Sequence, residues 1–286
     1  RGDLIDHLIY TAVFSADQAA QQAACWLIRR AGAALGIVSA SIQPLYEAMG
    51  REDVRGFTVP AINLRGLTYE SAQAVFRAMM KGKVGPVIFE IARSEIDYTS
   101  QRPVEYTAAV IAAAIKTGYR GPVFLQGDHF QINAKKFAAD AAKETQTVKN
   151  LIWEAIEAGF YNIDIDTSTL VDLSKPTVTE QQQTNFSLAA ELTTMIRDLE
   201  PEGITISVGG EIGEVGGKNS TVEELEAYMD GYLAELKKQG ESLKGISKIS
   251  VQTGTTHGGV PLADGSVAKV KIDFAVLEKL SAVARS

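Results

Sequence analysis

The chain has 286 residues, of which 45% are hydrophobic and 22% charged, and its formal net charge is −7. This composition is typical of a globular protein and excludes a chain that is disordered throughout. The acidic balance provides no general basic field, so we expect no nucleic acid among its partners, although a local pocket for a small anion is compatible with it.

Location can be judged from cysteine content and hydrophobic runs. Cys25 is the only cysteine, so no intrachain disulfide can form, and we expect a cytoplasmic protein. No secretory signal is visible in the first residues, and we expect none. The longest uncharged early stretch, residues 31–46, is shorter than the about 20 residues that a membrane span needs. We therefore expect no membrane segment.

Residues 3–50 show a helical pattern. Apolar side chains recur at spacings of three and four near the start, and residues 19–35 are rich in helix formers. We expect residues 1–55 to form a helical N-terminal extension, in which His7 packs or lies at the surface and is no ligand.

From residue 57 onward, apolar strands alternate with helical stretches. The expected strands lie near residues 57–64, 86–92, 122–127, 161–165, 204–208 and 246–252. The expected helices lie near residues 68–81, 103–117, 147–158, 179–199, 221–239 and 274–285. The strands are continuous apolar runs, as in a parallel sheet that is covered on both faces.

Two α/β architectures satisfy this pattern: an open doubly wound sheet and a TIM-type (β/α)8 barrel. Polar residues near the end of nearly every strand favour the barrel, since its strands carry their functional residues to one face. These residues are Asn63, Glu90, Asp128, Asp166, Glu211 and His257. Only six of eight units are visible in residues 56–286, so we expect the full protein to supply about two more after them.

The strand near residues 122–127 ends in Asp128, which is followed directly by His129. The chain has three histidines, and His257 also follows an apolar strand, so these two scarce residues favour a single site. Adjacent residues of a regular strand point to opposite faces. Asp128 and His129 can share a site only if the strand breaks, and we expect the break at Gly127 because glycine has the conformational freedom for it.

Several short motifs occur in a fixed order along the chain. They are Val59-Pro-Ala-Ile-Asn63, Gly127-Asp-His129, Ile165-Asp-Thr-Ser168, Gly210-Glu-Ile-Gly-Glu-Val-Gly-Gly217, Thr255-Thr-His-Gly258 and Lys271-Ile-Asp-Phe274. Together they resemble the class II, metal-dependent fructose-bisphosphate and tagatose-bisphosphate aldolases. The resemblance implies a lyase that cleaves or forms a carbon–carbon bond in a phosphorylated ketose, with Zn²⁺ or another divalent metal, and a homo-oligomer.

The resemblance also implies roles for individual residues. Asp128 matches the acid/base that exchanges a proton with the oxygen of the aldehyde product. Asn63 matches a polar residue at the substrate, and Gly258 a glycine near its phosphate. Four residues match metal ligands, two histidines and two carboxylates: His129, His257, Asp166 and Glu211.

The sequence departs from the family pattern in three places. The third zinc histidine is expected after Ser286, Gln126 stands where many relatives have histidine, and Lys218 follows Gly217 where the fructose-bisphosphate branch has an acidic loop. The alternative function is therefore a catalytically silent aldolase-like subunit or a phosphosugar-binding protein. A P-loop kinase is disfavoured, because its motif would require a glycine at Ile212.

Overall fold

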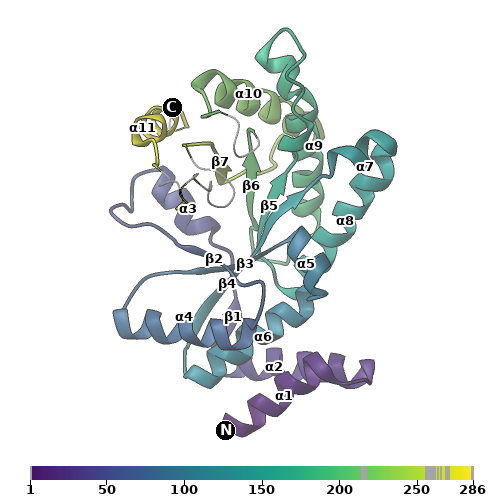
Figure 1. Cartoon of the computed structure of the whole chain (residues 1–286), viewed down its shortest axis with the longest axis vertical. Helices are drawn as coiled ribbons and strands as arrows, with labels where there is room; N and C mark the ends of the chain where they lie inside the picture. Colours follow the sequence, from purple (N-terminus) through teal and green to yellow (C-terminus); the bar gives the residue numbers. More distant parts are fainter. Residues whose placement is uncertain are drawn as a thin grey trace.

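The computed structural model describes residues 2–213, 218–254, 262, 264, 266–267 and 271–284 (Figure 1). The strands are β1 (Ile37–Ser39), β2 (Ala61–Asn63), β3 (Ile88–Ala92), β4 (Gly121–Gln131), β5 (Asn162–Asp166), β6 (Ser207–Glu211) and β7 (Lys248–Ser250). The helices are α1 (Gly2–Phe14), α2 (Gln18–Ala34), α3 (Gln43–Gly50), α4 (Thr68–Gly82), α5 (Arg93–Thr99), α6 (Pro103–Thr117), α7 (Ala134–Ala139), α8 (Ala141–Ala158), α9 (Val178–Asp198), α10 (Val222–Gln239) and α11 (Phe274–Ala284), with a 3-10 turn at Ser168–Leu170.

Six parallel strands form a half-barrel in the order β2-β3-β4-β5-β6-β7. Spatial order follows chain order throughout, as in a TIM-type barrel, whereas a doubly wound sheet reverses direction at a switch point. The predicted barrel architecture, incomplete in this chain, is therefore confirmed. All six expected strands and all six expected helices are present, and α6 has the predicted limits, Pro103–Thr117.

Strand β1 was not expected, because residues 3–50 were predicted to be helical. It pairs with residues 121–123 of β4, and β5 takes up pairing with β4 only from Gln126 onward. The fully buried Asn162 joins the three strands: its amide donates to the carbonyls of Ala40 and Leu125, and its oxygen accepts the N–H of Ile42. The N-terminal segment is thus hydrogen-bonded into the sheet.

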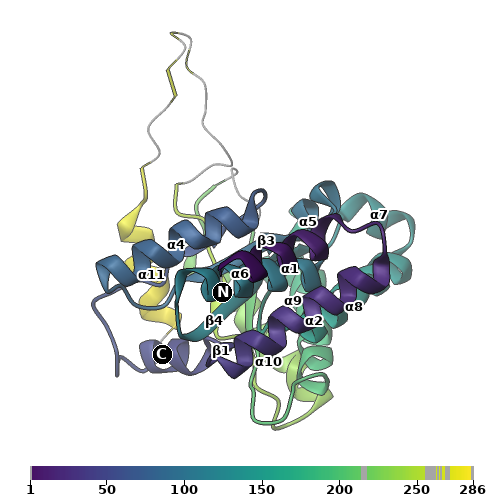
Figure 2. The ribbon, with the colours of Figure 1, turned by 90° about the horizontal axis from the view of Figure 1, so that it is seen from below.

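Helix α6 is the central helix of the outer layer. Proline at its first position and Gly118 just beyond its end, with φ +80°, mark its limits. It is apolar on nearly all sides because it contacts α1, α2, α4, α8 and β1. Figure 2 shows α1 and α2 packed beside one another over α6.

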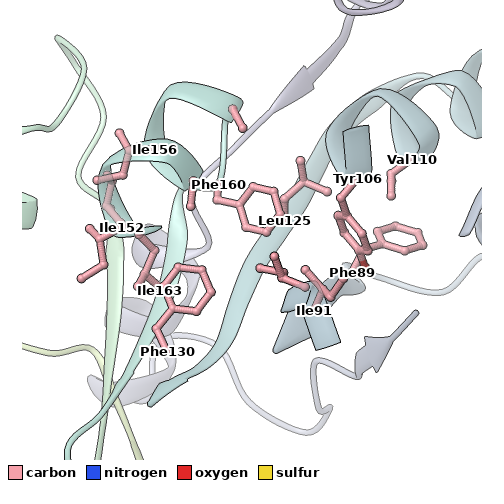
Figure 3. Packing of buried hydrophobic residues seen from close by; sticks show 14 of the residues in the cluster. Phe89, Ile91, Tyr106, Val110, Leu125, Phe130, Ile152, Ile156, Phe160 and Ile163 are labelled. Atoms are coloured by element: carbon pink, nitrogen blue, oxygen red, sulfur yellow. The ribbon is translucent and has the colours of Figure 1, made fainter. Parts of the chain in front are cut away.

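A single buried cluster connects the strands to these helices. Phe89, Leu125 and Phe160 belong to it together with Tyr106 of α6 (Figure 3). The hydroxyl of Tyr106 donates to the carbonyl of Glu90, 2.8 Å away, so the polar end of this buried ring is satisfied. Within the described ranges, no helix is long and apolar enough to cross a membrane.

Candidate metal centre

A β-bulge in β4 shapes the candidate site. Gln126 and Gly127 pair with Asn162 and Ile163, but Phe130 and Gln131 pair with Ile165 and Asp166. Strand β4 therefore carries one more residue than β5 across this interval, which defines a bulge. Its left-handed residue is His129, with φ +41°, a backbone conformation that is uncommon for residues other than glycine.

The prediction of a break at Gly127 was right about the place and wrong about the mechanism. The strand continues to Gln131, and the left-handed conformation lies at His129. Gly127 is required for its size: a Cβ there would lie 2.5 to 2.8 Å from three ring carbons of Phe130. Phe130 is fully buried in the same cluster as Ile152 and Ile163 (Figure 3), so the ring has no free space in which to move.

Three predicted ligands meet at the carboxyl ends of β4, β5 and β6. His129 Nδ1 lies 3.3 Å from Asp166 Oδ2 and 3.1 Å from Glu211 Oε2. The ligand atoms of the three residues all lie within 4.8 Å of one another, and no other group of this kind occurs in the described part of the chain. Both carboxylates are buried, with side chains 2% and 5% exposed, whereas the His129 side chain is 34% exposed.

The electrostatics of this cluster favour a cation. Hydrogen bonds to Asp166 and Glu211 raise the pKa of His129 to about 11. Burial acts to raise the pKa of Asp166, but hydrogen bonds from His129, Ser168 and Gln131 outweigh it and lower the pKa. Burial raises the pKa of Glu211. Two buried carboxylates that converge on one point are costly without positive charge nearby.

Three residues that the sequence analysis did not propose for the site donate hydrogen bonds to Asp166 or Glu211. Ser168 donates to Asp166 Oδ1 through its N–H at 3.1 Å and its hydroxyl at 2.7 Å. Gln131 Nε2 donates to Asp166 Oδ2 at 2.5 Å. The buried Asn185 donates to the carbonyl of Glu211 at 2.8 Å. Ser168 lies within a quoted motif, but nothing local in the sequence indicates that Gln131 or Asn185 reaches this point.

Asp128 lies directly beside the cluster. Its Oδ1 is 3.5 Å from His129 Nε2, and Asn63 Nδ2 donates to its Oδ2 at 3.2 Å. Burial raises the pKa of Asp128, while His129 acts in the opposite direction. The structure thus brings together Asn63, Asp128, His129, Asp166 and Glu211, which were all predicted to share one site. His257 and Gly258 lie outside the described residues.

A second group of polar side chains lies in the half-barrel around Gln126, two residues before Asp128 in β4. Gln126 donates to Glu90 Oε2 at 2.6 Å and accepts a hydrogen bond from Lys248 Nζ. Lys248 Nζ also lies 2.7 Å from Asp164 Oδ1. This position calls for a side chain that donates to a carboxylate and accepts from an ammonium group, and an amide does both. The contacts give Gln126, a departure from the family pattern, a physical role.

Comparison with known proteins agrees with this geometry. Residues 45–284 match the family described as fructose-bisphosphate aldolase class II. The chain belongs to this family. The half-barrel and the clustered His129, Asp166 and Glu211 are therefore features of a class II aldolase family member.

Among solved structures, the chain is similar to a probable tagatose 6 phosphate kinase from Sinorhizobium meliloti 1021. The two are 23% identical, the TM-score is 0.59, and the match covers 80% of this chain and 55% of that one, so it shows a shared fold. The carboxyl transferase domain of Rhizobium etli pyruvate carboxylase matches at 12% identity and a TM-score of 0.39, over 87% of this chain and 36% of that one. The second value is too low to support an argument. No curated protein matches the chain.

Proposed function

We propose that this class II aldolase family member is a zinc-dependent lyase that cleaves or forms a carbon–carbon bond in a phosphorylated ketose. The observation that carries the proposal is the convergence of His129, Asp166 and Glu211 on one point, with Asp128 adjacent to them. The family match over residues 45–284 makes metal-dependent chemistry the expected use of such a cluster.

The donor set fits a divalent ion. Zinc accepts imidazole nitrogen and carboxylate oxygen, and a catalytic zinc site keeps a position open. The two buried carboxylates supply negative charge, and the partly exposed His129 leaves the cluster open to solvent on one side. We infer from the motif match that His257 adds a second imidazole.

The chemistry divides between the metal and the protein. When bound, a divalent ion acts as a Lewis acid toward the substrate carbonyl and stabilises the negative charge that develops on the three-carbon fragment. Asp128 exchanges a proton with the oxygen of the aldehyde fragment, accepting it in cleavage and returning it in synthesis. Its raised pKa makes the protonated form more accessible, and Asn63 holds its second oxygen in place.

The remaining proposals follow from family membership. The substrate is a small phosphorylated sugar that yields dihydroxyacetone phosphate and an aldehyde, and Gly258 approaches its phosphate. The protein works in the cytoplasm as a homo-oligomer, without nucleic acid or membrane partners. We propose that the chain divides into an N-terminal extension, residues 1–55, and an aldolase-like barrel, residues 56–286. The family match begins within the extension, at residue 45.

Metal analysis combined with a cleavage assay tests the proposal. The purified full-length protein should contain zinc or another divalent ion, and should cleave fructose or tagatose bisphosphate in a reaction that a chelator abolishes. A protein without metal, or cleavage that is indifferent to the chelator, would refute it. Binding of metal and sugar phosphate without any cleavage would instead favour the catalytically silent subunit.

A further inference from the structure

The two carboxylates of the cluster are held very differently. Both face His129 Nδ1, but Asp166 also receives two hydrogen bonds from Ser168 on Oδ1 and one from Gln131 on Oδ2. Within the described residues, the side-chain oxygens of Glu211 contact His129 alone. A carboxylate has about four lone-pair positions, so Asp166 is held in place by several donors, whereas Glu211 is not.

The bulge in β4 is what brings Gln131 to Asp166. If the pairing of Gln126 with Asn162 and of Gly127 with Ile163 continued in register, Phe130 would stand opposite Asp166. The extra residue moves Gln131 into that place. The feature that turns His129 toward the two carboxylates therefore also delivers an amide donor to one of them.

Hydrogen bonds from Arg93 and to Glu144 hold the backbone at and just after Gln131. Arg93 Nη1 donates to the carbonyl of Gln131 at 2.5 Å and to Glu144 Oε1 at 2.6 Å. Glu144, whose side chain is 3% exposed, also accepts the N–H of Asn133 at 2.8 Å. The carbonyl of Gln131 and the N–H of Asn133 are thus tied to α5 and α8, which limits the movement of the Gln131 amide relative to Asp166.

We propose that Gln131 is a positioning residue of the metal centre, holding the Asp166 carboxylate in place where it faces His129 Nδ1. The proposal rests on the proposed metal-dependent function. The Gln131 side chain is exposed, but it donates to a carboxylate that is almost wholly buried, where a hydrogen bond to a charged group is strong.

Zinc affinity tests this role directly. Gln131→Met keeps the length of the side chain and removes the donor, so zinc should bind about 10- to 100-fold more weakly, measured by competition with a chromogenic chelator. Gln131→Asn keeps an amide that is too short to reach and should show the same loss. The matched control is Gln146→Met, on the exposed face of α8, where Gln146 donates to the side chain of Asn150; its zinc affinity should equal that of the parent.

A double-mutant cycle shows whether Gln131 acts through Asp166. In an Asp166→Asn background, Gln131→Met should cause no further loss of zinc affinity. Gln131→Met also removes a hydrogen bond to a buried carboxylate and should lower the melting temperature of the metal-free protein, so zinc is titrated at a temperature where circular dichroism shows every variant to be folded. The inference is overturned if Gln131→Met binds zinc like the parent, or if the loss is equally large in the Asp166→Asn background. A parent protein that binds no zinc defeats the proposed function itself, a result distinct from both.

Discussion

Replacing Gly127 with alanine should destabilise the protein through contact with one neighbour. The added Cβ would lie 2.5, 2.6 and 2.8 Å from three ring carbons of Phe130, where carbon atoms normally approach to about 3.5–4.0 Å. Phe130 is fully buried, so the ring or the backbone must shift into packed surroundings. Overpacking of this kind costs about 1–3 kcal/mol. We expect the free energy of unfolding in urea to fall by about 2 kcal/mol, a roughly 30-fold change in the folding equilibrium.

A second substitution and a control isolate the cause. Phe130→Leu should cost less in the Gly127→Ala protein than in the parent, because the smaller side chain removes the clash as well as some packing. Gly85→Ala is the matched control: a Cβ at Gly85 meets nothing within 4 Å, and the unfolding free energy should change by less than about 0.5 kcal/mol. The reasoning is refuted if Gly127→Ala is as stable as the parent, or if Phe130→Leu costs as much in both backgrounds.

Three further changes probe the centre and its surroundings. Asp128→Asn should retain zinc but lower kcat for ketose cleavage about 100- to 10,000-fold; unchanged turnover would exclude Asp128 from proton transfer. Burial, with Asp128 and Asp164 nearby, raises the pKa of Glu90 from 4.5 to about 7, so the folded state holds this proton more tightly and loses stability as pH rises from 4.5 toward 7. The unfolding free energy of Glu90→Gln minus that of the parent should therefore be up to about 3 kcal/mol larger at pH 8 than at pH 4. A difference between variant and parent that is the same at both pH values would contradict this. Arg93→Met leaves the buried Glu144 without its cation and should cost about 3–5 kcal/mol in urea unfolding; adding Glu144→Gln should recover part of that cost, and no recovery would show that the ion pair is not the cause.

The features predicted well from the sequence are those that depend on local pattern. The alternation of apolar runs with helical stretches located the six strands and helices of the half-barrel, and the helix predicted at residues 103–117 is α6. The joint position of Asn63 and Asp128 followed from a general rule, since parallel strands carry their carboxyl ends to one edge.

The features that the sequence did not reveal depend on contacts between distant segments. The three-residue strand β1 is too short to show a periodicity of its own, and it is held by β4 and by the side chain of Asn162. The bulge brings the ring of Phe130 against Gly127, and the contact of Gln131 with Asp166 depends on the register shift. No window of neighbouring residues contains that information.

The attachment of β1 has a consequence for the order in which the chain folds. Ile42 and Asn162, which join β1 to the barrel strands, are 120 residues apart in the chain, so during synthesis the first helices emerge long before the strands that hold β1. Contacts of such long range form late because chain closure must precede them. We therefore expect β1 to gain protection from hydrogen exchange after β4 and β5 in a pulse-labelling experiment, although it is synthesised before both of them.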